Sequence, residues 1–182
     1  MKFSELINLR QSTRKYSSAP ISREILDQCI EATRLAPSAC NAQPYTFIVV
    51  DDQELKNKVA GETCGLIDKF NKFTLNAPVM VVIVIEKANI TSQAGTIIKK
   101  IEYPLVDIGI AAEHFCLQAA ELGIGTCMIG WFNEKPIKNI LNIPDKKNIG
   151  LLISVGYPES NNIRTKVRKE ISKISSYNGY ER

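Results

Sequence analysis

The sequence predicts an α+β protein in which helices and strands are arranged around one sheet. The first two predicted helices follow each other without a strand between them, so a regular alternation of strand and helix fails. The chain has 182 residues, of which 45% are apolar and 23% charged, and it is long enough to bury a substantial core. No repeat, low-complexity run or flexible linker divides it, so we expect a single domain over residues 1–182.

Hydrophobic spacing and capping residues define the predicted elements. Phe3, Leu6 and Ile7 recur at helical spacing, and Ser22 is suited to cap a second helix that ends before Pro37. Further helices are predicted over residues 54–60, 104–122 and 134–141, and strands over residues 46–50, 79–85, 126–129 and 151–155.

Two of these elements have the clearest patterns. Residues 79–85 are a continuous, largely β-branched run, which is typical of a central strand covered on both faces. Residues 104–122 carry a wide apolar stripe with small residues on it, and Gly123 is suited to follow the last turn of that helix. No element is assigned to residues 86–101.

Composition excludes several classes of protein. The longest apolar stretch, residues 77–85, is well short of the ~20 residues that cross a bilayer, so we expect no membrane span. The N-terminus turns polar before an apolar signal region can form, which makes the cytoplasm the expected compartment. Cys29, Cys40, Cys64, Cys116 and Cys127 form no C-x-x-C pair, so neither a disulfide framework nor a metal site is predicted.

Positive charge is concentrated at the two ends of the chain. The net charge is +4, and residues 163–182 alone carry six basic and two acidic residues, so the rest of the chain is neutral. Within that neutral body, residues 1–16 are again basic. Two basic ends are compatible with binding a nucleic acid, or with folding together around one small anion such as a phosphate.

Two short motifs at these ends are candidates for anion binding. Arg10 and Arg14 converge in either a helical or an extended chain, and with Ser12 they make an anion clamp, although a solvated basic helix end is the alternative. In an extended chain Lys166 and Arg168 point to the same side, which makes a second candidate phosphate contact or a charged tail.

Two other segments are suited to a flat ligand. Residues 37–44 place Ser, Asn and Gln between two prolines, which suits a planar heterocycle, although an ordinary turn has the same composition. Gly130 follows a predicted strand and leaves backbone N–H groups uncovered, so a flat ligand can approach them. Residues 123–125 are not a dinucleotide fingerprint, because they follow a helix and the next glycine comes too late.

No catalytic constellation of side chains is evident. His114 is interpreted as a structural histidine on a helix, and Asp107 as a helix cap. Cys40 is the one candidate reactive thiol, with no second cysteine placed to resolve it. If the protein is an enzyme, a bound cofactor is expected to carry the chemistry.

Taken in order, the motifs resemble the nitroreductase family of FMN-dependent oxidoreductases. The resemblance spans residues 3 to about 170. It rests on Arg10-x-Ser12-x-Arg14, Pro37-Ser38-x-x-Asn41-x-Gln43-Pro44, Ala77-Pro78, Leu122-Gly123-x-Gly125-Thr126-Cys127-x-Ile129-Gly130, and Gly156-Tyr157-Pro158 before Lys166-x-Arg168.

The resemblance implies a homodimer with a mixed, mainly antiparallel sheet flanked by helices, and FMN at the subunit interface. It also implies hydride transfer from NADH or NADPH to flavin N5, and then electron transfer to a small acceptor in a ping-pong cycle. No side chain of the protein is expected to be catalytic in its own right. By similarity the cofactor contacts are Arg10, Ser12, Arg14, Lys166 and Arg168 for the phosphate and polar flavin edge, Pro37, Ser38, Ala39 and Asn41 from the partner, Asn71 for the pyrimidine ring, and backbone groups of Ile129 and Gly130 near N5.

The resemblance leaves the acceptor open. Residues 86–101 are short where larger members of the family insert helices that cover the substrate, so a nitroaromatic, a quinone or an enone are all candidates. Two alternatives to an enzyme remain at this point. One is a flavin-binding or sensor protein of the same fold with little turnover. The other is a basic nucleic-acid-binding module, which is the less favoured of the two because the basic ends lack interleaved aromatic residues.

Overall fold

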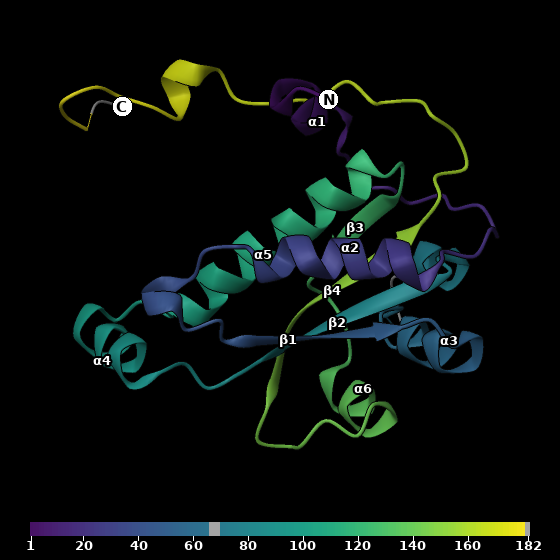
Figure 1. Cartoon of the computed structure of the whole chain (residues 1–182), viewed down its shortest axis with the longest axis horizontal. Coiled ribbons are helices and arrows are strands. Elements are labelled where there is room, and N and C mark those ends of the chain that lie inside the picture. The colour runs from purple at the N-terminus through teal and green to yellow at the C-terminus, as the bar shows by residue number, and fades with distance from the viewer. Residues whose placement is uncertain (66–69, 181–182) are drawn as a thin grey trace.

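A four-stranded antiparallel sheet lies between two layers of helices in the computed structural model, which describes residues 1–65 and 70–180 (Figure 1). The strands are β1 (Tyr45–Val50), β2 (Val79–Ile85), β3 (Gly125–Ile129) and β4 (Asn148–Gly156), in the order β1-β2-β4-β3. All neighbouring strands pair antiparallel, and within residues 1–65 and 70–180 a parallel pairing occurs only as an isolated bridge between Ser12 and Thr126. The predicted α+β class and mainly antiparallel sheet are therefore confirmed.

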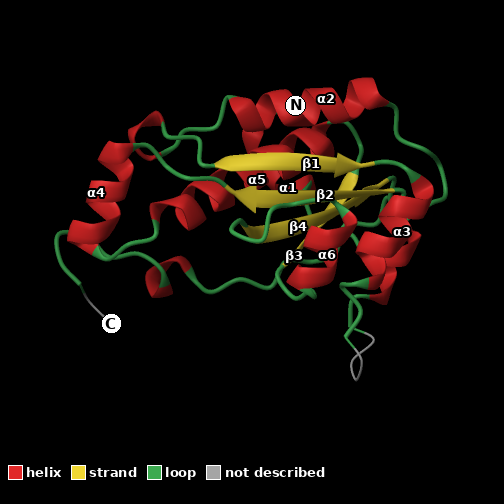
Figure 2. Ribbon diagram, turned by 90° about the horizontal axis from the view of Figure 1, so that it is seen from below, coloured by secondary structure: helices red, strands yellow, loops and turns green. Residues whose placement is uncertain are grey.

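The helices are α1 (Phe3–Leu9), α2 (Arg23–Arg34), α3 (Gln53–Gly61), α4 (Ile90–Lys99), α5 (Tyr103–Glu121) and α6 (Glu134–Ile140). Short 3-10 turns cover Ala39–Asn41 (η1), Lys72–Asn76 (η2) and Ile171–Lys173 (η3). Helices α2 and α5 cover one face of the sheet, and α3 and α6 cover the other (Figure 2).

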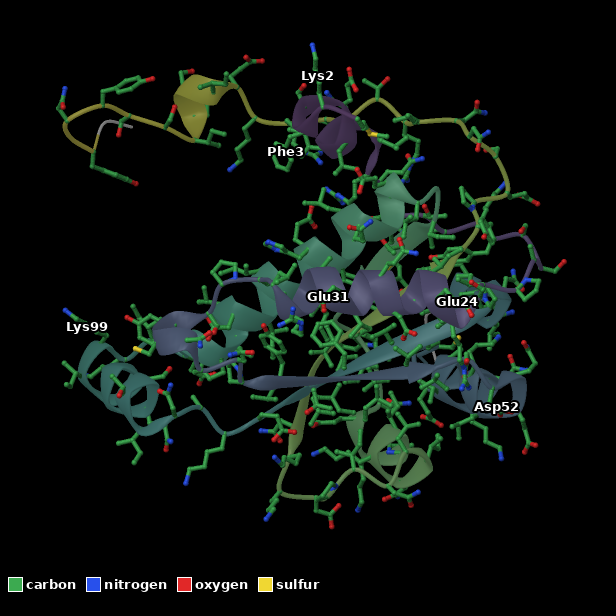
Figure 3. All side chains as sticks on the ribbon, in the orientation of Figure 1. Lys2, Phe3, Glu24, Glu31, Asp52 and Lys99 are labelled. Atoms are coloured by element: carbon green, nitrogen blue, oxygen red, sulfur yellow. The ribbon has the colours of Figure 1, made fainter. Side chains whose placement is uncertain are left out.

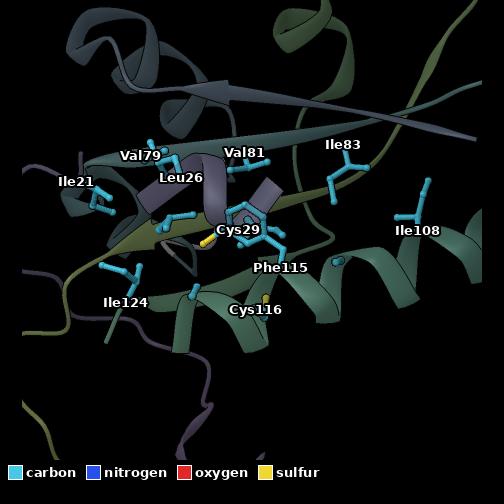
Figure 4. Packing of buried hydrophobic residues seen from close by; sticks show 14 residues of the cluster. Ile21, Leu26, Cys29, Val79, Val81, Ile83, Ile108, Phe115, Cys116 and Ile124 are labelled. Carbon is cyan, nitrogen blue, oxygen red and sulfur yellow. The ribbon is translucent and has the colours of Figure 1, made fainter. Parts of the chain in front are cut away.

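Strand β2 explains why both faces need cover. Alternate residues of a strand point to opposite faces, and β2 is apolar at every position. Val81 and Ile83 pack with Phe115 of α5 (Figure 4), whereas Met80 and Val82 belong to the cluster under α3 and α6. The predicted central strand covered on both sides is confirmed.

The outer side of helix α2 carries charged residues. Glu24 and Glu31 lie on the exposed side of α2 (Figure 3), opposite the buried Leu26 and Cys29. This amphipathic pattern is why the helix forms at the predicted place. The positive φ of Gly123, 76°, ends α5 as its sequence indicates.

Helix α4 lies where no element was assigned from the sequence. The side chain of Asn89 caps it by accepting a hydrogen bond from the backbone N–H of Ser92 at 2.9 Å. Ile90 and Ile98 remain 85% and 76% exposed, so the helix leaves apolar side chains in solvent within one chain. Among the described residues, no helix is long and apolar enough to span a bilayer.

Candidate functional site

The segment that follows α1 runs along the edge strand β3. The N–H of Thr13 donates to the carbonyl of Thr126 at 2.8 Å, and Ser12 bridges the same residue. Gly125 permits this approach, because a Cβ there would lie 2.5 Å from Oγ1 of Thr13. Thr13 is buried, so the alternation of an extended chain turns its neighbours Ser12 and Arg14 to the opposite, open side.

The C-terminal segment crosses this N-terminal segment. A guanidinium nitrogen of Arg164 donates to the carbonyl of Ser12. Nζ of Lys166 donates to the carbonyls of Ile7, at 2.7 Å, and Asn8, at the C-terminal end of α1. These carbonyls lack partners inside the helix and carry partial negative charge, so a lysine there is favourable. The two basic ends therefore lie together, as one of the two alternatives for them requires, and Figure 1 shows α1 beside the C-terminal segment.

The two segments enclose a cavity of about 300 Å³ with a strongly positive lining. We call this cavity the cradle. Its cationic and hydroxyl lining comprises Arg10, Ser12, Arg14, Arg164, Thr165, Lys166 and Arg168, and Gln11 and Val167 complete it. Five predicted contacts, Arg10, Ser12, Arg14, Lys166 and Arg168, are thus brought together.

Little negative charge balances the cradle. Glu113 of α5 pairs with Arg10 at 3.2 Å, and it is the one carboxylate within ion-pair distance of these cations in the described part of the chain. Burial and the neighbouring charges of Arg10 and Arg168 lower the pKa of Lys166. The cations therefore repel one another, and an anion in the cradle would relieve that repulsion.

A second group of predicted residues gathers around the end of β3. Nδ2 of Asn71 donates to the carbonyls of Thr63 and Trp131, both at 3.2 Å, which fixes the side-chain amide of this buried residue. Ile129 is buried, and Gly130 is exposed. A Cβ added at Gly130 would meet nothing within 4 Å, so the backbone there is open to a ligand.

Strand β3 connects this group to the cradle. Thr126 lies against Ser12, and Gly130 lies four residues further along, roughly 13 Å at the rise of a β-strand. The guanidinium of Arg14 also lies 5.8 Å from the ring centre of Phe73, in η2, which begins directly after Asn71. This arrangement suits an elongated ligand with an anionic group at one end and a flat polar ring at the other.

The third predicted group, the loop of Pro37, Ser38, Ala39 and Asn41, does not line the cradle in this chain. The loop lies beside the N-terminal half of α5, where the N–H of Ala39 donates to Oδ1 of Asp107 at 2.9 Å. The backbone φ of Asn41 is positive, at 51°, which asparagine tolerates better than most residues.

The contacts and exposure of Asp107, His114 and Cys40 bear on the roles that the sequence suggested for them. Asp107 is not a helix cap, because α5 begins at Tyr103; its carboxylate holds the loop instead. His114 is structural, since its Nδ1 lies 2.9 Å from the carbonyl of Ile110 in the same helix. Cys40 is exposed, as its place in a loop indicates.

The sequence did not predict four residues of the cradle lining as contacts: Gln11, Arg164, Thr165 and Val167. Arg164 was recognised as part of the basic run but was not predicted as a contact, and Gln11 was passed over as a spacer. For Gln11 the sequence gives no signal, because its partners lie more than 150 residues away.

Comparison with known proteins identifies the family of this chain. The sequence model of the Nitroreductase family matches residues 7–71 and 67–157. A nitroreductase family protein of Clostridium novyi NT is 33% identical, with a TM-score of 0.76 over 91% of this chain and 89% of that one. An FMN-dependent nitroreductase of Clostridium difficile R20291 is 29% identical, with a TM-score of 0.78 over 96% and 98%. An FMN reductase [NAD(P)H] of Bacillus subtilis is 33% identical over 74% of this chain and 57% of its own length. The family match covers well over half of the sequence, and the chain belongs to the nitroreductase family.

Proposed function

We propose that the protein is an FMN-dependent oxidoreductase that takes hydride from NADH or NADPH and passes electrons to a small acceptor by a ping-pong mechanism. Nitroaromatics, quinones and enones are the candidate acceptors. The observation that carries the proposal is the cradle, in which cationic side chains from both ends of the chain converge with little carboxylate to neutralise them. The names of an FMN-dependent nitroreductase and an FMN reductase among the relatives support the same cofactor.

The residues present fit FMN. Its phosphate carries about two negative charges, and charge-assisted hydrogen bonds from several cations suit such a group. We assign the phosphate to Arg10, Ser12, Arg14, Lys166 and Arg168, together with Arg164. We assign the flat ring to the open backbone at Ile129 and Gly130 and to the side chain of Asn71.

When bound, FMN supplies a hydride acceptor at N5 and an electron donor for the acceptor. The work of this chain is to bind and orient. Backbone N–H groups and cations near the ring favour negative charge on its polar edge. The open backbone at Gly130 would give the ring its place, and the nicotinamide and the acceptor would then meet the bound ring in turn, as a ping-pong cycle requires.

A complete site is proposed to require two copies of this single-domain chain. The loop of Pro37, Ser38, Ala39 and Asn41 stays away from the cradle of its own chain, so we assign it to the flavin of the partner. Apolar side chains that one copy leaves exposed support a homodimer: Val167, Ile171, Ile174, Tyr177 and Tyr180 are each between 68% and 89% exposed.

The proposal is tested by loading the purified protein with FMN, removing free flavin, and measuring NADH and NADPH oxidation with a nitroaromatic, a quinone and an enone. We expect a flavin spectrum, turnover with at least one acceptor, and parallel double-reciprocal plots, the signature of a ping-pong cycle. Flavin uptake without turnover would establish a flavin-binding protein instead. Salt-sensitive binding of DNA or RNA without flavin uptake would establish the nucleic-acid module.

A further inference from the structure

We propose that Gln11 is a positioning residue that fastens the C-terminal segment across the cradle and thereby sets the affinity for the phosphate of FMN. This inference rests on the proposed function for its ligand, and on the contacts within the chain for its geometry.

Both the nitrogen and the oxygen of the Gln11 side-chain amide form hydrogen bonds with the C-terminal segment. Nε2 donates to the carbonyl of Asn162 at 2.9 Å, and Oε1 accepts from the backbone N–H of Arg164 at 3.1 Å. One amide thus pairs with the carbonyl of Asn162 and with the N–H of Arg164, two residues later. A neighbouring strand offers the same pair of bonds to an extended chain, so Gln11 takes the place of a strand partner for residues 162–164.

The same oxygen also orients a cation of the cradle. Oε1 of Gln11 lies 3.3 Å from Nε of Arg164, and another nitrogen of that guanidinium donates to the carbonyl of Ser12. Arg164 is therefore held by both backbone and side chain. Lys166 follows two residues later and reaches α1, so the clamp at Gln11 also fixes where the next cation enters the cradle.

Repulsion between cations opposes docking of the C-terminal segment, and the neutral bonds of Gln11 act against it. Docking the C-terminal segment brings Arg164, Lys166 and Arg168 against Arg10 and Arg14, and like charges at these distances repel. Glu113 pairs only with Arg10 within the described residues, so carboxylates do not hold the segment in place. Gln11 does so with a neutral amide, which leaves the positive potential of the cradle intact for an anion.

Loss of the bonds of Gln11 should weaken the binding of FMN but not that of riboflavin. If FMN binds fully only to the docked segment, its apparent Kd rises as the docked fraction falls. Removing neutral hydrogen bonds of this kind changes an equilibrium by about tenfold, so we expect about a tenfold weaker FMN affinity. Riboflavin has the ring and no phosphate, so its affinity should stay within about twofold of its wild-type value.

The test uses Gln11→Leu, which keeps the size of the side chain and removes its polar ends. Gln28→Leu is the matched control, because Gln28 on α2 also donates an amide hydrogen bond to a backbone carbonyl, away from the cradle. FMN and riboflavin affinities are measured by flavin fluorescence for the wild type and both variants. We expect the ratio of the FMN Kd to the riboflavin Kd to rise about tenfold in Gln11→Leu alone. An unchanged ratio would overturn the inference.

A second measurement needs no flavin. Trypsin cleavage after Arg164, Lys166 and Arg168 is followed in the flavin-free proteins by mass spectrometry. We expect these bonds to be cut several-fold faster in Gln11→Leu than in the wild type or Gln28→Leu, and equal rates would overturn the clamp. If Gln11→Leu does not fold, Gln11→Ala takes its place in both measurements. A wild type that binds no FMN would refute the proposed function, and the cleavage rates would still decide the role of Gln11.

Discussion

Arg168 adds charge to the cradle without holding the fold together. In the described part of the chain, its side chain makes a hydrogen bond only to the carbonyl of its own neighbour, Val167. We therefore expect Arg168→Met to weaken FMN binding by about tenfold through loss of a charge-assisted contact, and to leave the melting temperature unchanged. Flavin fluorescence and thermal unfolding measure the two effects. Arg34→Met is the control, because Arg34 pairs with Glu31 on the exposed side of α2. Equal FMN affinities of the two variants would argue against the assignment of Arg168.

Gly130 tests the other end of the site. Its surroundings within the chain have room for a side chain, so Gly130→Ala and Gly130→Val should fold with wild-type stability. If the flavin ring lies against this backbone, the affinity for FMN should fall with side-chain size, mildly for alanine and by more than about tenfold for valine. Isothermal titration with FMN measures the series. A valine variant that binds FMN as well as the wild type does would place the ring elsewhere.

At the scale of single residues, the sequence predicts most of the charged residues of the cradle but not the neutral Gln11. Arg10, Ser12 and Arg14 form a spaced motif, and such a motif can be recognised before any fold is known. Gln11 acquires its role from backbone groups of Asn162 and Arg164, and hydrogen bonds from a side chain to distant backbone groups leave no pattern in the sequence.

Helix α3 and turn η2 are joined by a buried lysine. Lys56 is 1% exposed, and its Nζ donates to Oδ1 of Asn57 at 2.6 Å and to the carbonyl of Leu75 in η2 at 2.9 Å. No carboxylate within ion-pair distance of Lys56 occurs among the residues that the structure describes. Burial accordingly lowers the pKa of this lysine below its ordinary value.

The sign of the resulting pH dependence is determined by this shift. When the pH is below the folded-state pKa, the charged amine is buried at a cost in free energy. Between the folded-state pKa and the unfolded-state pKa, the unfolded chain binds more protons than the folded one, so a rise in pH stabilises the folded chain. The free energy of unfolding of the wild type should therefore rise relative to that of Lys56→Met as pH increases from 7 toward 10. Urea unfolding of both proteins at several pH values measures the difference. A difference that stays constant or falls with pH contradicts this account.

Long elements with a buried apolar face were predictable, whereas helix α4 was not. Strand β2 has a long apolar pattern because helices cover both of its faces, and helix α5 has one because it packs on the sheet. Helix α4 has exposed isoleucines and a glycine at its centre, so its pattern does not point to a core within one chain. The role of Asp107 was misassigned for a related reason, since its partner, the N–H of Ala39, lies in a loop 68 residues away.

The whole molecule is proposed to be a dimer in which the C-terminal segment has two tasks. Residues up to Arg168 complete the cradle, whereas Ile171, Ile174 and Tyr177 are exposed and contribute no cavity lining to it. We expect a chain that ends at Lys169 to keep its FMN contacts and to dissociate at about tenfold higher concentration than the full chain, because apolar area is lost from the interface.

Sedimentation velocity over a dilution series measures this effect, with the full chain expected at twice its mass of 20.3 kDa. A shortened chain with the same dissociation constant would assign these residues to something other than the dimer. A full chain that remains monomeric at every concentration would contradict the proposed site, because the loop of Pro37 and Ser38 would then have no flavin to contact.

At the scale of the whole molecule, counting charges along the sequence located the positive charge at the two ends of the chain. A neutral body with two basic ends left open whether the ligand is a long polyanion or a single phosphate. The fold favours the phosphate, because Lys166 and Arg164 turn inward onto carbonyls of residues 7–12 and enclose a small cavity with Arg10.

The central claim is that the cradle holds FMN in a position where NAD(P)H can reduce it. Its most direct test is anaerobic absorbance spectroscopy of the purified, FMN-loaded protein during addition of NADH or NADPH, followed by a nitroaromatic or quinone. The account predicts a yellow protein that bleaches with the nicotinamide and regains its colour with the acceptor. A colourless protein that takes up no FMN would contradict it.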